Sequence, residues 1–333
     1  MNRHAFLPCF ILCLFAQLAL AQVPSEKEAL NFYLLRGLGR ESGHWGNTFM
    51  QEVQAVYPST SFTLLDLPGA GRFHEEPAKI AIEGMASFLQ ATYKDSLIDK
   101  EGKNILLATS LSGNVALEWV LHQPENFHAL ILVGTSLRKV CKKKERVQQA
   151  AKKEFFDIFF TSAVEEREAK FLHINSNLYA ENDSILRRWI DIQEKRPVSK
   201  HTLFKQTMAG MFYLTPEVRP AIPVLVVGSR GDRIVDEVCI QKVADHLQAD
   251  RLMHESAGHG IPIDAPVWLA HQVSLWTEAN RLEMEEGYAQ PLVYEDEQGL
   301  NDILSFGWVE DGVSSAWRAS GRAVKSTVAL AGL

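Results

Sequence analysis

Five nearly continuous apolar runs alternate along the chain with stretches of helical character. The runs cover residues 30–37, 62–69, 104–110, 128–136 and 223–232. Strands of a parallel sheet that is covered on both faces have this pattern, because the side chains of both faces are buried. Residues 79–93 and 238–248 show helical spacing of their apolar positions between such runs. The alternation predicts an α/β fold with a doubly wound, mostly parallel sheet.

One long interval of the chain carries no strand pattern. Residues 137–220 hold several helical stretches that are rich in Phe, Leu and charged residues. We therefore expect a helical insertion, the cap, between the fourth and fifth strands. The core then consists of residues 22–136 and 221–285. Residues 286–333 contain many small residues without a clear period, and we expect a loosely attached or disordered tail.

The N-terminus has the pattern of a secretory signal peptide. Arg3 precedes an apolar run over residues 5–20, and the sequence Ala-Leu-Ala at 19–21 closes it. These features predict cleavage after Ala21 and a secreted or periplasmic protein, with an uncleaved anchor as the alternative. The run is short for a helix that spans a bilayer. We expect no stable membrane span after cleavage.

The composition argues against several functional classes. The chain has 333 residues, of which 46% are hydrophobic, and a formal net charge of −7, whereas a general nucleic-acid binder is basic. The basic run at 138–146 is typical of a solvated helix face. Cys141 and Cys239 remain after signal cleavage, and we expect two free thiols rather than a disulfide bridge. The sequence shows no spacing of metal ligands, and we expect no metal or cofactor.

The segment ILLATSLSGNVALEW, residues 105–119, predicts a strand, a sharp turn and a helix. Ser110 lies at the apex of the turn, as in a nucleophile elbow, whose usual pattern is G-x-S-x-G. Small residues at the glycine positions let the strand and the helix approach each other. Here Ala108 and Ser112 stand at those positions, so we expect a more crowded turn. On this segment alone, Ser110 is either a nucleophile or an ordinary turn serine.

A serine nucleophile needs a base and an acid, and candidates for both follow Ser110 in the chain. Asp232 comes just after the fifth apolar run, at the sheet edge where open α/β sheets bind ligands. His259 lies in a loop between two glycines, and such a loop can bring an imidazole over that edge. Asp236 is the rival acid. His254, the rival base, lies in an apparent strand, where side chains are more often packed.

A tetrahedral intermediate also needs N–H donors for its oxyanion. The N–H of Leu111, directly after the serine, is one candidate. The loop after the first apolar run offers the N–H of Leu38, which lies between two glycines. These two residues are our prediction for the oxyanion hole.

Further residues of that loop are candidates for substrate binding. We expect Arg40, His44 and Trp45 at the mouth of the site. Arg40 either pairs with Glu41 or binds an acidic group of the substrate. Several apolar residues of the cap suit an apolar acyl chain, and they equally suit packing between cap and core: Phe155, Phe156, Phe159, Phe160, Met208, Met211 and Phe212.

The same loop also has features of a dinucleotide-binding fingerprint. Gly37, Gly39 and Gly43 follow a predicted strand, and Asp66 ends the next one. A nicotinamide-dependent oxidoreductase is therefore an alternative hypothesis. Against it, no helix of sufficient length starts within the glycine-broken loop, and Asp66 suits a tight turn at the end of a strand.

Over residues 30–282 the chain resembles the α/β-hydrolase fold superfamily. The resemblance is carried, in the family's order, by LLRGLGRESGHWG, LLDLPGAGRF, LLATSLSGNVALEW, VLVVGSRGDRIV and AGHGIPIDAP. It implies a catalytic triad of Ser110, His259 and Asp232, with Leu38 and Leu111 as oxyanion donors. It also implies that the cap covers the site.

Four positions depart from the family's pattern. Arg36 replaces the usual histidine, and Ala108, Ser112 and Asn114 replace two glycines and a larger apolar residue. The fold alone does not choose among the chemistries of the superfamily. Our main hypothesis is hydrolysis of a small carboxylic ester with an apolar acyl part, through an acyl-enzyme. The alternatives are a non-catalytic binding protein, and an acyltransferase or an amide or C–C hydrolase that uses the same triad.

Overall fold

A computed structural model describes residues 29–98 and 101–286, all of which belong to one compact unit. The predicted signal peptide and residues 287–333 of the predicted tail lie outside the described residues. Across the described residues, no helix is both long enough and apolar enough to cross a membrane.

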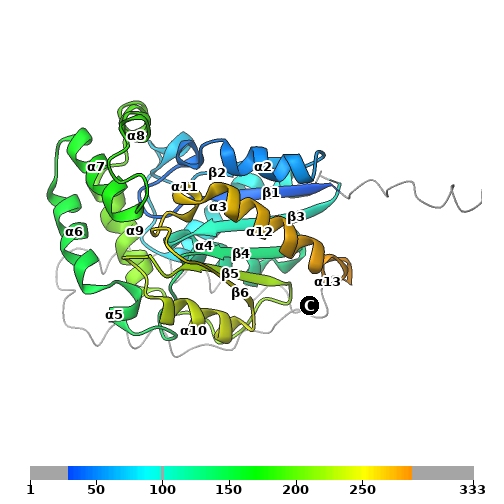
Figure 1. The fold of residues 1–333 in the computed structure, drawn as a ribbon. Coiled ribbons are helices and arrows are strands. Elements are labelled where there is room, and N and C mark those ends of the chain that lie inside the picture. The colour runs from blue at the N-terminus through cyan, green and yellow to red at the C-terminus, as the bar shows by residue number, and fades with distance from the viewer. Residues whose placement is uncertain (1–28, 99–100, 287–333) are drawn as a thin grey trace, which may run out of the picture. The chain divides into compact units, whose positions relative to one another are not determined.

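Six parallel strands form one sheet in the order β2-β1-β3-β4-β5-β6 (Figure 1). Their bounds are Leu30–Leu35 (β1), Ser61–Leu65 (β2), Lys103–Thr109 (β3), Ala129–Val133 (β4), Val224–Ser229 (β5) and Asp250–His254 (β6). The central strands β1, β3, β4 and β5 are buried almost throughout, which explains their continuous apolar runs. The edge strand β6 is exposed or half-buried, so its pattern is weaker. The predicted fold class is confirmed.

Helices cover both faces of the sheet. On one face, α2 (Thr48–Val56) packs beside α12 (Pro266–Ala279), and the other face carries α3 (Ile82–Ile98), α4 (Leu111–His122) and α10 (Glu237–Leu247). Alternate residues of β1 enter the two cores, Phe32 and Leu34 on the first face and Tyr33 and Leu35 on the second. The remaining short elements of the core are η1 (Ser42–Trp45), η2 (Gly71–Phe73), η3 (Pro124–Asn126), α11 (Ile261–Asp264) and α13 (Arg281–Glu286).

Between β4 and β5, the chain forms five helices and no strand. They are α5 (Lys143–Arg146), α6 (Gln149–Phe160), α7 (Val164–Asn175), α8 (Asp183–Lys195) and α9 (Lys200–Phe212). The side chains of Asn182 and Ser199 accept the N–H of Ile185 and Thr202, and so cap α8 and α9. In Figure 1 these green helices lie together beyond the end of the sheet where the strands finish.

Cys141 and Cys239 form a disulfide bridge, so the expectation of two free thiols is wrong. Cys141 lies between β4 and α5, at the start of the cap, and Cys239 lies in α10 of the core. The two residues are 98 positions apart in the sequence, and nothing in their spacing indicates that they meet. The bridge ties the beginning of the cap to the core helix that follows β5.

We expect the double replacement of Cys141 and Cys239 by Ser to lower the free energy of unfolding by about 2–5 kcal/mol, because the bridge closes a long loop in the unfolded chain. Urea unfolding with and without a reductant measures this difference. Reductant should shift the wild-type midpoint and leave the midpoint of the double variant unchanged. A wild-type midpoint that does not respond to complete reduction would contradict the prediction.

Candidate active site

Ser110 occupies a strained turn between β3 and α4. Its backbone angles are φ 55° and ψ −124°, in a region that residues other than glycine rarely adopt. The N–H of Ser110 donates to the carbonyl of Val133 at 2.8 Å, and its carbonyl accepts the N–H of Gly113 at 3.0 Å and the hydroxyl of Thr135 at 3.2 Å. These bonds to β4 and to the segment after it hold the turn in place.

The turn is packed so closely that two neighbouring positions have no room for a side chain. A Cβ on Gly37 would lie 2.9 Å from the Cβ of Ser110, and a Cβ on Gly113 would lie 2.0 Å from the hydroxyl of Thr135. Ser112, which we expected to crowd the turn, is fully buried there, and its hydroxyl donates to the carbonyl of Arg36 at 2.5 Å. Ser112 thus links α4 to the loop after β1.

Ser110, His259 and Asp232 form one chain of hydrogen bonds. The Oγ of Ser110 lies 2.8 Å from Nε2 of His259, and Nδ1 of His259 lies 2.7 Å from Oδ2 of Asp232. The other carboxylate oxygen of Asp232 accepts the N–H groups of Ile234 and Val235. Because the carboxylate accepts the proton on Nδ1, Nε2 is left as an acceptor for the serine hydroxyl. The arrangement can therefore remove a proton from Ser110.

Asp264 in α11 holds the loop that carries His259. Its carboxylate accepts the N–H of Gly258 at 2.6 Å, the N–H of Asn177 at 2.8 Å and the hydroxyl of Ser176. Gly258 belongs to the histidine loop, and the other two residues belong to the segment between α7 and α8. Asp264 therefore joins the histidine loop to the cap. Nothing in the sequence indicates this role, since an aspartate five residues after the histidine carries no distinctive pattern.

The rival acid, Asp236, and the rival base, His254, form hydrogen bonds with backbone N–H groups close to them in the sequence. Nδ1 of His254 accepts the N–H of Ala257 at 2.9 Å. Asp236 caps α10 and accepts the N–H of Val238 at 2.9 Å. Within the described chain, neither residue has a hydrogen bond to Ser110 or to His259.

The two predicted oxyanion donors flank the serine. Leu111 is the first residue of α4, and Leu38 directly follows Gly37, which packs against Ser110. Neither N–H has an acceptor among the residues that the structure describes. The next N–H, that of Gly39, donates to Oε1 of Gln206 in α9 at 2.9 Å, which fixes the loop to the cap.

A cleft with about 30 Å³ of free volume lies in front of the serine. Its lining is Arg36, Gly37, Leu38, Arg40, Thr109, Ser110, Phe155, Phe171, Asn175, Ile234, His259, Gly260 and Pro262. Of the seven apolar cap residues that we considered for an acyl pocket, Phe155 lines this cleft, whereas Phe156, Phe160, Met211 and Phe212 are more than half exposed. No group of three or more potential metal ligands occurs in the described part of the chain.

Arg40 and Glu41 both form ion pairs with the cap rather than with each other. The guanidinium of Arg40 pairs with Glu168 of α7, with the nearest atoms 2.6 Å apart and both side chains buried. Glu41 pairs with the guanidinium of Arg196, which directly follows α8. Arg40 lines the cleft, as expected, but its charge is already compensated by Glu168.

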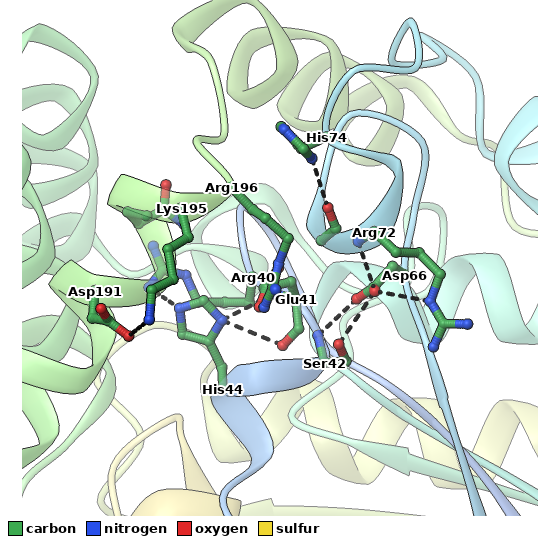
Figure 2. A network of polar contacts seen from close by, with 12 residues as sticks. Arg40, Glu41, Ser42, His44, Asp66, Arg72, His74, Asp191, Lys195 and Arg196 are labelled. Carbon is green, nitrogen blue, oxygen red and sulfur yellow. Dashed lines mark hydrogen bonds and ion pairs between the residues drawn. The ribbon is translucent and has the colours of Figure 1, made fainter.

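His44 and Trp45 lie in the interior, which corrects their expected place at the mouth. His44 is fully buried, its ring 5.3 Å from that of Trp189, and its Nε2 lies 3.1 Å from the Arg40 guanidinium (Figure 2). Trp45 is 3% exposed and packs on Phe49 of α2. Neither residue lines the cleft. The tight loop after β1 turns both rings away from it.

Asp66, the acid of the possible dinucleotide fingerprint, joins two loops instead. Its carboxylate accepts the N–H of Ser42 at 2.7 Å and the N–H of Arg72 at 3.1 Å (Figure 2). Burial raises the pKa of this carboxyl. The loop after β1 contains only the single turn η1, which is too short for the helix that a dinucleotide site requires.

Comparison with known proteins gives structural matches only. No family model and no curated protein matches the chain. Two solved esterase structures are similar to the chain. The one from Rhodococcus sp. has 15% identity and a TM-score of 0.59, and the match covers 75% of this chain and 91% of that chain. The thermophilic one from Thermogutta terrifontis has 17% identity and a TM-score of 0.57, over 75% of this chain and 90% of that chain. A structure described as a membrane phospholipase A, a bacterial virulence factor, has 18% identity and a TM-score of 0.62, over 77% of this chain and 81% of that chain. The chain therefore has the α/β-hydrolase fold, as its resemblance implied.

Acidic pH should destabilise the protein through His44. Burial above all, and then the charges of Arg40 and Arg36, hold the pKa of His44 well below its usual value of 6.5. The unfolded chain therefore binds a proton at His44 below about pH 6.5 that the folded chain does not bind. From this residue alone, stability then falls with decreasing pH by up to about 1.4 kcal/mol per pH unit.

Urea unfolding between pH 5 and pH 8 measures this slope. We expect His44→Gln, whose amide oxygen can still accept from Arg40, to flatten the slope. The same change at the exposed His201 should leave it as in the wild type. Equal slopes in the wild type and His44→Gln would contradict the prediction.

Proposed function

We propose that the protein is a serine hydrolase that cleaves carboxylic esters through an acyl-enzyme on Ser110. The observation that carries this proposal is the unbroken hydrogen-bond chain from Ser110 through His259 to Asp232 beside an open cleft. The esterase names of two structural neighbours agree with it. Ala108, Ser112 and Asn114, which depart from the usual elbow pattern, are all buried within the elbow. Their presence therefore gives no reason to prefer a non-catalytic binding protein.

In the first half of the reaction, Oγ of Ser110 attacks the carbonyl carbon of the ester while Nε2 of His259 takes the hydroxyl proton. The carbonyl oxygen becomes an oxyanion, which the N–H groups of Leu38 and Leu111 stabilise. Asp232 stays ionised and stabilises the imidazolium. The C–O bond to the alcohol then breaks, Nε2 gives its proton to the leaving oxygen, and the acyl group remains on Ser110.

In the second half, a water molecule attacks the acyl carbon and gives a proton to Nε2 of His259. The bond between the acyl carbon and Oγ of Ser110 breaks, and the proton returns to the serine. The products are the carboxylic acid and the free enzyme. An acceptor alcohol in place of water would give acyl transfer by the same steps, and no feature of the described residues favours it.

We also propose that the protein is exported. The pattern of residues 1–21 motivates this proposal, and the Cys141–Cys239 bridge supports it, because disulfides persist mainly in oxidising compartments. Fractionation of expressing cells, with the mass of the mature chain, tests it. A full-length chain in the cytoplasm would overturn it.

Hydrolysis of p-nitrophenyl butyrate tests the proposed reaction. We expect Ser110→Ala and His259→Gln to lower kcat by at least about 10³-fold, since each removes an atom that moves in the reaction. Ser256→Ala, at an exposed serine near the histidine loop, is the matched control and should keep wild-type turnover. Ser110→Ala protein that is folded and retains more than about a tenth of the wild-type kcat would refute the assignment.

A further inference from the structure

Leu38, a predicted oxyanion donor, lies between a part of its loop that the core holds and a part that the cap holds. On the core side, the carbonyl of Arg36 accepts the hydroxyl of Ser112 at 2.5 Å. Gly37 packs so closely on Ser110 that a Cβ there would lie 2.9 Å from the Cβ of the serine. The elbow therefore fixes the two residues that precede Leu38.

The three residues after Leu38 each bind a side chain from a different part of the cap. One link is a hydrogen bond from the backbone, and the other two are ion pairs. The cap therefore determines where this half of the loop lies. The links join Gly39 to Gln206 in α9, Arg40 to Glu168 in α7, and Glu41 to Arg196 directly after α8.

The link of Gly39 differs from the two ion pairs because it acts on the backbone. The ion pairs hold the ends of the long side chains of Arg40 and Glu41, which several rotatable bonds separate from the main chain. The N–H of Gly39 belongs to the same planar peptide unit as the carbonyl of Leu38. Its hydrogen bond to Gln206, at 2.9 Å, therefore sets the orientation of that unit directly.

Glycine at position 39 makes this orientation depend on a partner. The N–H of Arg40 donates to the carbonyl of Gly37 at 3.1 Å, so residues 37–40 form a turn whose third residue, Gly39, has φ 65°. Turns with positive and with negative φ at the third residue differ by a rotation of the central peptide unit, and glycine allows both. The hydrogen bond from Gln206 selects one of them.

The face of α9 that carries Gln206 is shaped to fit Gly39. A Cβ at Gly39 would lie 2.4 Å from Cδ2 of Leu203, which is three positions before Gln206 and so lies on the same side of the helix. Gln206 is fully buried, and its Nε2 has no partner among the described residues. Its bond to Gly39 is thus the polar contact that accounts for an amide at this buried position.

We propose that Gln206 is a positioning residue for the oxyanion hole, which acts through the N–H of Gly39 to hold the N–H of Leu38 where the oxyanion forms. This inference rests on the proposed function. Gln206 itself does not line the cleft. Oxyanion donors are effective only when they are preorganised at the place where the charge develops. The cap then contributes to stabilisation of the transition state through a residue that does not touch the substrate.

Hydrolysis of p-nitrophenyl butyrate by Gln206 variants tests this role. Gln206→Met keeps the length of the side chain and loses the acceptor for Gly39. We expect its kcat to fall about 10- to 100-fold with little change in KM, because the oxyanion exists only after the attack. Gln206→Glu keeps an oxygen acceptor in either protonation state and should stay close to the wild-type kcat. Folded Gln206→Met with the wild-type kcat, or folded Gln206→Glu as slow as Gln206→Met, would overturn the proposal.

Gln193→Met is the matched control. Gln193 is also a buried glutamine of the cap, in α8, and its Nε2 likewise has no partner among the described residues. Its Oε1 accepts the N–H of Val198 at 3.1 Å and Nη2 of Arg167 at 3.3 Å, so the change removes an acceptor inside the cap and no link to the loop. We expect a lower Tm with an unchanged kcat. A fall in kcat equal to that of Gln206→Met would show general loosening of the cap and contradict the proposal.

A transition-state analogue gives a readout that a merely structural role would not change. With butyl trifluoromethyl ketone, Oγ of Ser110 adds to the carbonyl carbon, His259 takes the hydroxyl proton, and the carbonyl oxygen becomes an oxyanion in the hole. Its inhibition constant should rise in Gln206→Met by the factor by which kcat/KM falls. The inhibition constant of butyl methyl ketone, a ground-state analogue, should stay the same. Equal binding of the trifluoromethyl ketone by the wild type and Gln206→Met would refute the role.

The two proposals fail in different ways. Wild-type protein that hydrolyses no ester would overturn the proposed function and, with it, any role of Gln206 in catalysis. Wild-type protein that hydrolyses esters at Ser110, with Gln206→Met turning over at the same rate, would overturn the inference about Gln206 alone.

Discussion

The strained backbone of Ser110 is the constraint on which the site depends. A residue with φ 55° and ψ −124° costs on the order of 1–3 kcal/mol, so the surroundings must enforce it. Here Val133 of β4, Gly113 of α4 and Thr135 supply the hydrogen bonds, and the missing side chains of Gly37 and Gly113 give the space. The result is a hydroxyl at the end of the sheet, 2.8 Å from an imidazole whose other nitrogen lies 2.7 Å from the Asp232 carboxylate.

The cap completes the site through a small number of polar links to the core. Arg40 pairs with Glu168, Gly39 donates to Gln206, and Asp264 binds the segment between α7 and α8. Buried links of this kind fix one arrangement, because breaking them leaves uncompensated polar groups.

Much of this structure could be predicted from the sequence, for definite physical reasons. Parallel strands buried on both faces leave continuous apolar runs, and the residues after them meet at one sheet edge. Ser110 and Asp232 follow such runs, and His259 lies in a loop further along the chain. Their types and order therefore predicted the three residues that the structure brings together. The edge strand β6 was less distinct, since half of its environment is solvent.

Other features could not be predicted, because they depend on pairing between distant residues. Glu168 lies 128 positions from Arg40, and Arg196 lies 155 positions from Glu41. Neither partner choice is encoded in local patterns, and the same holds for the Cys141–Cys239 bridge. The most direct test of the account is labelling of the intact protein with a fluorophosphonate probe, followed by mass spectrometry of the adduct. The account predicts one adduct, on Ser110, that is lost in His259→Gln, whereas a folded wild-type protein without an adduct on Ser110 would contradict it.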